Sequence, residues 1–280
     1  MQKNLKKYFP IFVLPTLVAF ALAFLIPFLM GLYLSFCKFT TVVDAQFIGL
    51  GNYVRAFQNP DFIQALKFTG GFTVVTVITI NIGAFLLALV LTRNLKGTNL
   101  FRTTFFMPNL IGGIVLGYIW QLIINGVLIS RGATILSDAK YGFWGLVILM
   151  NWQLIGYMMI IYIAGIQNIP GDVMEAAKID GASKFQTLFK ITIPLVMPSF
   201  TICLFLTLTN SFKLFDQNLA LTAGKPGTST QMLALDIYNT FYGRTGWEGV
   251  GQAKAVMFFV IVGAIALIQL YITRRKEVEN

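Results

Sequence analysis

Few residues in this sequence are of the types that build catalytic or metal sites. The chain contains no histidine, which excludes His-based triads, His-ligated metals and His proton relays. Its two cysteines, Cys37 and Cys203, lie in or beside apolar runs without metal-ligand spacing, so we expect both to be buried apolar residues. No Gly-x-x-x-x-Gly-Lys-Ser/Thr occurs, and Gly224-Lys225 is followed by Pro226. The sequence therefore contains no phosphate-binding loop of this type.

The remaining chemistry is recognition, and the most polar segment of the chain is the place for it. Residues 175–181 read Glu-Ala-Ala-Lys-Ile-Asp-Gly, and after nine residues 191–194 read Ile-Thr-Ile-Pro. Asp172 as N-cap and Glu175 three residues later form a capping-box pattern, which predicts a short helix over about 173–180. Gly181 predicts a turn, because glycine alone adopts positive φ freely.

A second short helix is expected over about 182–190. It would present Phe185, Leu188 and Phe189 on one side by their three-and-four spacing. Pro194 would then open the next long helix, where its missing N–H leaves no helical bond unmade. The residues alone leave two interpretations open: an element that another protein binds, or an amphipathic hairpin lying on lipid headgroups.

Composition places most of the chain in lipid. Of its 280 residues 56% are hydrophobic and 11% charged, with a mean hydropathy of +0.74. So few charges cannot cover a water-exposed surface, for which about a quarter is usual. The net charge of +10 would suggest nucleic acid in a soluble protein. Here the basic residues flank apolar runs, so we attribute them to membrane topology.

Six apolar runs are long enough to span a bilayer as helices. Their predicted ranges are 9–36, 68–91, 105–129, 143–166, 194–212 and 253–272. The first run contains Pro15 and Pro27, and we expect a retained helix rather than a cleaved signal peptide, because its apolar length exceeds that of a signal core. The sequence thus predicts a multi-pass membrane protein of one domain, 1–280.

The orientation follows from lysine and arginine, which concentrate on the cytoplasmic side. Twelve of the lysines and arginines lie in four short segments, the last of which ends at Lys276. The other nine lie in the three longer segments that alternate with these along the chain. The denser set is cytoplasmic. Both termini and the segment 172–190 are then predicted to lie inside the cell, in the plasma or inner membrane.

A polar path through the membrane is predicted in the fourth and fifth runs. Polar residues at membrane depth are costly and often mark a pathway. The candidates combine amide, hydroxyl and aromatic groups, which suit a sugar: Asn151, Trp152, Gln153 and Tyr157 in the fourth run, and Thr207, Asn210 and Ser211 in the fifth. Helix-to-helix hydrogen bonding is the alternative for the last three, and the preferred role for Asn81 in the second run.

The polar segment resembles a family motif. Glu-Ala-Ala, three residues, Gly, nine residues and Ile-x-Leu-Pro is the EAA motif of ABC importer permeases, and this chain departs from it only at Ile193. The matching positions are Glu175, Ala176, Ala177, Gly181, Ile191 and Pro194. In that family this segment is the coupling helix that sits in a cleft of the cytoplasmic ATPase. The resemblance therefore implies ATPase coupling through these residues, with Phe185 beside them.

Further motifs resemble the carbohydrate branch of that family, the MalF-like permeases. They are Phe-x-Gly-Leu-x-Asn-Tyr at 47–53, Phe-Lys-x-Phe-Asp at 212–216 and Leu-Thr-x-Gly-x-Pro at 221–226. The resemblance implies an all-α, type I ABC importer transmembrane fold of six helices, in a short form without extra N-terminal spans. It also implies that the fourth and fifth runs carry sugar contacts, with Trp152 and Tyr157 at aligned positions.

The implied function is that of a permease subunit in an ATP-driven, binding-protein-dependent importer of sugars or oligosaccharides. This chain would be no enzyme and hold no cofactor, since ATP and Mg would be bound by the ATPase. The implied partners are a second, MalG-like permease, two cytoplasmic ABC ATPase subunits, an extracellular or periplasmic solute-binding protein and membrane lipid, and no nucleic acid. A permease for glycerol-3-phosphate or another small polar solute is the alternative. An ion-coupled carrier or a membrane-embedded enzyme is a remote one, because no acidic residue is predicted deep in a span.

Overall fold

The computed structural model describes residues 2–93 and 96–275, which are mostly α-helical. Lys276, counted above in the last cytoplasmic segment, lies outside them. The chain divides into two compact units. Unit 1 comprises the residues up to Pro60 together with Ile237–Phe259, and unit 2 comprises Asp61–Asp236 with the residues from Val260 on. The helices α13 (Leu233–Gly243) and α14 (Glu248–Arg274) contribute residues to both units.

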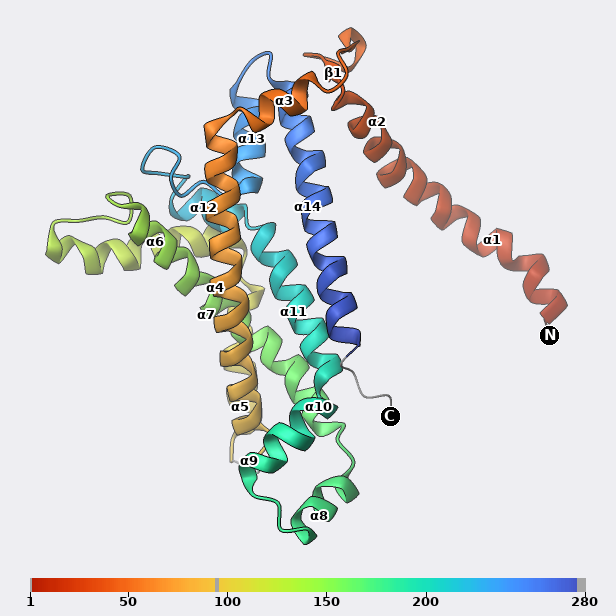
Figure 1. Ribbon diagram of the computed structural model, residues 1–280, viewed down its shortest axis with the longest axis vertical. Helices are drawn as coiled ribbons and strands as arrows, with labels where there is room; N and C mark the ends of the chain where they lie inside the picture. Colours follow the sequence, from red (N-terminus) through yellow and green to blue (C-terminus); the bar gives the residue numbers. More distant parts are fainter. Residues whose placement is uncertain (1, 94–95, 276–280) are drawn as a thin grey trace. The chain divides into compact units, whose positions relative to one another are not determined.

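Unit 1 begins with a long helical run and continues into a small cap (Figure 1). Its elements are α1 (Gln2–Phe20), the π-helical turn η1 (Ala21–Leu25), α2 (Ile26–Leu34), β1 (Cys37–Lys38), the 3-10 turn η2 (Val42–Asp44), β2 (Gln46–Phe47) and α3 (Gly51–Phe57). β1 and β2 pair antiparallel with Cys37 opposite Phe47. Buried Asn52 donates to the carbonyls of Ser35 and Cys37 at 2.9 and 2.8 Å, which fixes the cap on the end of α2.

Two details of unit 1 follow from local chemistry. The π-turn η1 ends two residues before Pro27, whose ring nitrogen cannot complete the α-helical bond to the preceding turn. The backbone N–H groups of Thr41 and Thr40 donate to the Asp44 carboxylate and hold its pKa below the usual value. The most apolar 18-residue stretch of this helical run has no buried residue, and Leu34 is the one buried residue of α2.

Unit 2 contains the helices that carry the predicted site. They are α4 (Pro60–Leu91), α5 (Thr98–Phe106), the 3-10 turn η3 (Met107–Leu110), α6 (Gly113–Leu128), the 3-10 turn η4 (Ile129–Arg131), α7 (Ala139–Gln167), α8 (Gly171–Ile179), α9 (Lys184–Thr187), the π-turn η5 (Leu188–Thr192), α10 (Ile193–Leu195), α11 (Met197–Phe212) and α12 (Asp216–Leu221). Its core lies between α4, α7 and α11, where apolar side chains such as Ile80, Met158 and Cys203 are fully buried.

Five helices of the described chain are long and apolar enough to cross a membrane, or six if one bent pair counts as a single span. That pair is Lys184–Leu195 with Met197–Phe212, bent by 68°. This confirms the predicted all-α, multi-pass fold. Three helices exceed their predicted ranges: the run predicted at 68–91 begins at Pro60, that predicted at 143–166 is α7 from Ala139 to Gln167, and that predicted at 253–272 is α14.

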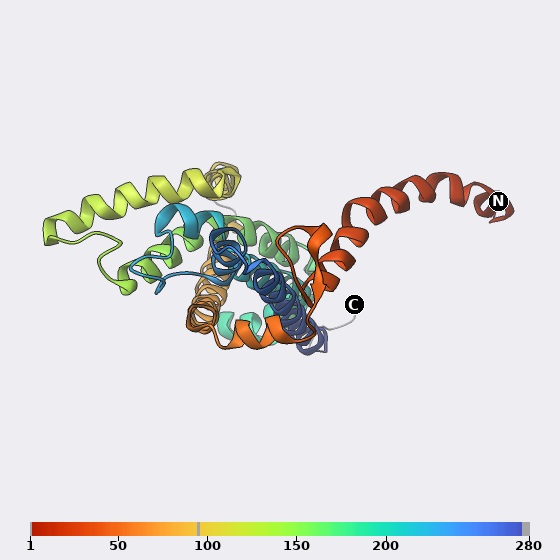
Figure 2. The same cartoon turned by 90° about the horizontal axis from the view of Figure 1, so that it is seen from above.

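The run predicted as one helix over 105–129 is divided. α5 ends at Phe106, η3 follows, and α6 begins only at Gly113. Pro108 lacks the N–H that a continuous helix needs, and Gly112 is extended at φ −60°, ψ 140°, so the chain turns there. Figures 1 and 2 show α6 running crosswise to α4, whereas α5 runs along the same direction as α4.

A polar contact joins the three core helices; we call it the Asn81 contact. Asn81 of α4 accepts from the Tyr162 hydroxyl of α7 at 2.7 Å and donates to Thr207 Oγ1 of α11 at 3.3 Å. Phe85 and Phe200 pack against the Tyr162 ring at centroid distances of 5.4 and 4.8 Å. Asn81 therefore holds helices together, the role that its isolated position in an apolar run predicts.

Close backbone approach joins α5 to α7. A Cβ placed on Gly156 of α7 would lie 1.8 Å from the carbonyl oxygen of Phe105, which is backbone and cannot move aside cheaply. On α4, by contrast, a Cβ on Gly71 would meet nothing within 4 Å. Alanine substitutions at the two glycines therefore distinguish the effect of close helix packing, which applies only at Gly156, from the effect of helix propensity, which applies at both.

We predict that Gly156→Ala lowers the free energy of unfolding by about 1–3 kcal/mol, the usual effect of overpacking a tight contact. Gly71→Ala, the matched control, should leave stability unchanged or raise it by up to about 1 kcal/mol, because alanine favours helix. Thermal unfolding in detergent with a thiol-reactive dye measures both, since Cys37 and Cys203 are buried and free. Equal melting temperatures for the two variants would contradict the close contact.

Candidate functional site

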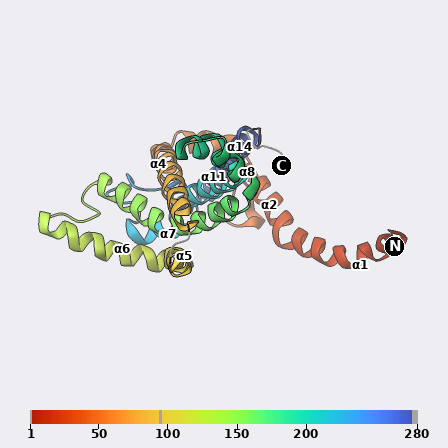
Figure 3. The same ribbon diagram turned by 90° about the horizontal axis from the view of Figure 1, so that it is seen from below.

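The polar segment joins α7 to α11 and lies at one end of unit 2. Figures 1 and 3 show α8 and α9 together beyond the C-terminal end of α4. α8 begins at Gly171 after Pro170, and no side chain caps it. The predicted capping box of Asp172 and Glu175 is therefore wrong: Asp172 is already inside the helix, because the chain enters it two residues earlier than the pattern predicts.

The turn predicted at Gly181 is confirmed. Its φ is +72°, a conformation that L side chains rarely adopt, and a Cβ there would meet nothing within 4 Å. The Ala182 N–H then donates to the carbonyl of Ala177 at 3.0 Å, which closes the end of α8. Glycine is required at this position by its backbone alone.

A capping box does occur, but at the start of α9. The Gln186 N–H donates to Ser183 Oγ at 3.3 Å, and the Ser183 N–H donates to Gln186 Oε1 at 2.8 Å. Ser-x-x-Gln is visible in the sequence and could have located this helix start. The single helix predicted over 182–190 is in fact α9 followed by the π-turn η5, which ends two residues before Pro194.

The predicted coupling residues differ in exposure. Glu175, Ala176 and Gly181 are exposed, Ile191 and Pro194 are half-buried, and Ala177 is the one buried residue of α8. The three apolar side chains of the second helix do not share one environment. Leu188 packs against the core, whereas Phe185 and Phe189 are 73% and 58% exposed and stack at a centroid distance of 5.7 Å.

The chain bends where the fifth span was predicted to begin. α10 ends at Leu195 and α11 begins at Met197, with Val196 between them at φ −91°, ψ 1°. Pro198 follows, and the two parts meet at 68°. The prediction that Pro194 opens the fifth span is therefore wrong, because Pro194 lies in the short helix α10 before the bend.

The polar residues of α7 face three different neighbours. Gln153 is buried; it accepts from Gln217 of α12 at 2.8 Å and donates to the carbonyl of Ile111 at 3.4 Å. Trp152 is half exposed and packs edge-on against Trp120 of α6 at 5.7 Å. Gln217 was missed by the sequence reasoning, because it lies beyond the fifth apolar run.

Tyr157 and Asn151 keep part of their surface accessible. The Tyr157 ring meets Phe106 of α5 edge-on at 6.3 Å. The Asn151 side-chain amide donates to the carbonyl of Val147 in its own helix at 2.8 Å. This bond leaves the Asn151 side-chain oxygen able to accept a hydrogen bond from a ligand. Both residues lie on faces of α7 that are not fully covered.

The polar residues of α11 divide between packing and exposure. Thr207 and Ser211 are fully buried: Thr207 accepts from Asn81, and Ser211 lies 2.9 Å from the Thr76 hydroxyl of α4. Asn210 is exposed and donates to the carbonyl of Leu206 in its own helix at 2.8 Å. The first two therefore occupy the helix-packing positions that the sequence left as an alternative, and Asn210 does not.

Comparison with known proteins gives a family match over most of the chain. The model of the family described as binding-protein-dependent transport system inner membrane component matches residues 80–278. The probable starch degradation products transport system permease protein AmyD of Thermoanaerobacterium thermosulfurigenes is 46% identical, over 96% of this chain and 94% of its own length. The trehalose/maltose transport system permease protein MalF of Thermococcus litoralis is 29% identical over 94% and 92%.

The fold is similar to that of solved transporter chains. A chain from the crystal structure of a bacterial ABC transporter involved in the import of the acidic polysaccharide alginate matches with a TM-score of 0.83 at 21% identity, covering 98% of each chain. A second alginate transporter structure, in complex with a pentasaccharide-bound periplasmic protein, gives a TM-score of 0.81 at 23% identity, covering 98% of this chain and 97% of that one. At such identities the likeness concerns the fold.

Proposed function

This chain belongs to the binding-protein-dependent transport system inner membrane components, and from that premise we propose that it imports sugars or oligosaccharides as one permease subunit of an ATP-driven transporter. One observation carries the sugar class: a relative named for starch degradation products is 46% identical over nearly the whole chain. Relatives named for multiple sugars and for lactose, 28% and 30% identical, support the same class. A transport subunit needs no catalytic side chains, which agrees with a sequence that has no histidine.

The proposed coupling element is α8 with the Gly181 turn. Its exposed face, which includes Glu175 and Ala176, is free for an ATPase subunit. α7 precedes it in the chain, and α9, η5 and α10 connect it to α11. Movement of α8 would therefore reach both helices that carry the polar residues. We propose two ATPase subunits that bind ATP and Mg, a second permease, and a solute-binding protein at the outer face, with both termini of this chain in the cytoplasm.

The proposed sugar path runs past the polar residues that keep accessible surface. These are Asn151, Trp152 and Tyr157 on α7 and Asn210 on α11. They supply amide and hydroxyl partners and aromatic faces, which are the groups that hold a sugar by hydrogen bonding and stacking. Gln153, Thr207 and Ser211 are proposed to hold the surrounding helices in place instead, because their polar atoms bond to neighbouring elements.

The coupling proposal predicts that Gly181→Ala uncouples transport. Alanine at φ +72° costs about 1–2 kcal/mol, which reduces the native turn about 5- to 30-fold against alternative conformations. Labelled-sugar uptake in reconstituted transporter should fall at least about fivefold at that energy, while the permease stays inserted and the ATPase still hydrolyses ATP or dissociates.

Gly171→Ala is the matched control, because Gly171 opens the same helix, has no positive φ and leaves its Cβ with nothing within 4 Å. It should transport normally. Glu175→Ala tests the side chain rather than the backbone and should lower ATPase retention on purification. Normal uptake and retention in both Gly181→Ala and Glu175→Ala would contradict coupling through α8.

The path proposal predicts weaker sugar handling without loss of assembly in the pair Tyr157→Ala and Asn210→Ala. Each removes a hydrogen bond of about 0.5–1.5 kcal/mol, so the half-saturating sugar concentration should rise roughly 2- to 10-fold for each. Thr207→Val, on the same helix as Asn210, should instead lower thermal stability and leave the sugar dependence unchanged. If Thr207→Val alters the sugar dependence and the pair does not, the assignment is reversed.

A further inference from the structure

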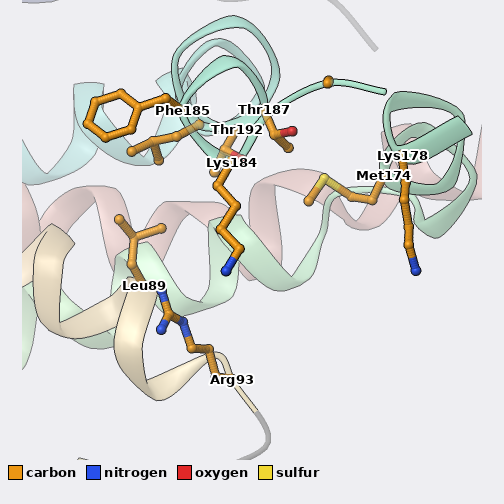
Figure 4. A pocket seen from close by; sticks show the side chains of 10 residues that line it. Leu89, Arg93, Met174, Lys178, Lys184, Phe185, Thr187 and Thr192 are labelled. Carbon is orange, nitrogen blue, oxygen red and sulfur yellow. The ribbon is translucent and has the colours of Figure 1, made fainter. Parts of the chain in front are cut away.

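A cleft of about 750 Å³ lies between the C-terminal end of α4 and the segment that contains α8 and α9. Figure 4 shows it from close by, with side chains from α4, α8 and α9 around it. Ala177 is the one buried residue of α8, every residue of which the structure describes. Met174 and Lys178 of α8 line this space, so part of the helix faces the cleft instead of packing on the helices of the core.

Three basic side chains from three separate elements line the cleft. Arg93 follows α4, Lys178 lies in the last turn of α8, and Lys184 is the first residue of α9. Figure 4 shows the Lys184 and Arg93 side chains extending toward each other. No Asp or Glu is among the described residues that line the cleft, and the nearby Asp172 and Glu175 of α8 are exposed outside it. Lys178 lies apart from the pair of Lys184 and Arg93, beyond Met174. Basic side chains that line one cleft without a carboxylate favour a bound anion.

The cleft also has an apolar wall, which a simple anion would not need. Leu89, in the last turn of the apolar helix α4, lines it together with Leu188, Met174 and Phe185. Because Leu89 belongs to the span and Arg93 follows its end, the cleft reaches from the edge of the hydrocarbon layer into the headgroup layer. An amphiphile with a negative head and an apolar tail matches this order of side chains.

We propose that this cleft binds an anionic phospholipid, with its phosphate against Arg93 and Lys184, Lys178 adding positive charge at the far wall, and its acyl chains along Leu89 and Leu188. The proposal rests on the cytoplasmic placement of α8 given above. A lipid suits the site better than an acidic protein segment does. A polypeptide reaching Leu89 would bring backbone polar groups to the edge of the hydrocarbon layer, where they lack partners, whereas a lipid is already present at that depth.

The bound lipid would connect α4, which is fixed in the core, to α8 and α9, which are not. It fills the space on the inner side of α8 while the outer side, with Glu175, stays available to the ATPase. The lipid is thereby part of the support on which the coupling segment rests, and the composition of the membrane becomes an input to coupling.

The test uses the intact transporter, purified with its partner subunits in nanodiscs of phosphatidylcholine. Phosphatidylglycerol is added in steps, and native mass spectrometry counts the molecules that each complex retains. The cleft variant combines Arg93→Gln, Lys178→Gln and Lys184→Gln. At roughly fivefold per basic side chain, it should lose on the order of a hundredfold in phosphatidylglycerol affinity. Lys184→Gln alone should lose about fivefold, which keeps the test usable if the triple variant does not assemble.

The matched control removes the same charge outside the cleft through Lys96→Gln, Lys190→Gln and Arg274→Gln, all exposed residues. It should retain phosphatidylglycerol within about twofold of the wild type, a charge effect far below that of the cleft. Equal losses in the two triple variants, or no preference of the wild type for phosphatidylglycerol over phosphatidylcholine, would overturn the proposal.

Two further arms separate the sources of the anion. Inorganic phosphate at millimolar concentration should not displace phosphatidylglycerol; full displacement would make the cleft a site for free phosphate and overturn the lipid assignment. The second arm compares the permease pair with and without the ATPase subunits. Loss of phosphatidylglycerol binding when the ATPase subunits are present would show that protein occupies the cleft, which would also overturn the lipid assignment. Lipid retention is measured without sugar or uptake, so an error in the proposed substrate would leave the outcome intact.

Discussion

The arrangement of unit 2 depends on the Asn81 contact. In lipid a buried amide must find its partners inside the protein, and Asn81 finds them on two other helices at once. This fixes which faces of α4, α7 and α11 meet. The hydrogen bond between the Thr76 and Ser211 hydroxyls, at 2.9 Å, is a second polar contact between α4 and α11. α7 leads into α8 and α11 follows α10, so both flanks of the polar segment are held by the same contact.

The segment between those flanks is constructed in the opposite way. α8 has one buried side chain, α9 is a single capped turn, and the aromatic pair of Phe185 and Phe189 is exposed. Elements with few buried contacts are those that move or bind partners at low energetic cost. The rigid three-helix core thus holds the residues of the proposed sugar path in place. The thinly packed segment at its end is the part that can move with the partner.

The sequence was most informative where backbone chemistry is local. The turn at Gly181 needs only a residue that tolerates positive φ, and the apolar runs follow from composition. It was least informative where two patterns competed. Asp172 and Glu175 form a good capping pattern, yet Ser183 and Gln186 are the residues that cap. Whether Thr207 faces a path or a neighbouring helix depends on which helices meet, and a hydroxyl in an apolar run fits both.

The two π-turns have a consequence for comparing this chain with its relatives. Each holds one residue more than an α-helical turn, and each ends two residues before a proline, Pro27 and Pro194. One extra residue rotates every later side chain by about 100° around the helix axis relative to an uninterrupted helix. A helical wheel drawn through residues 188–192 therefore misassigns the faces that follow. A one-residue deletion within these turns can be absorbed there as an ordinary α-helical turn, with the bonding pattern of α2 and α10 left in place.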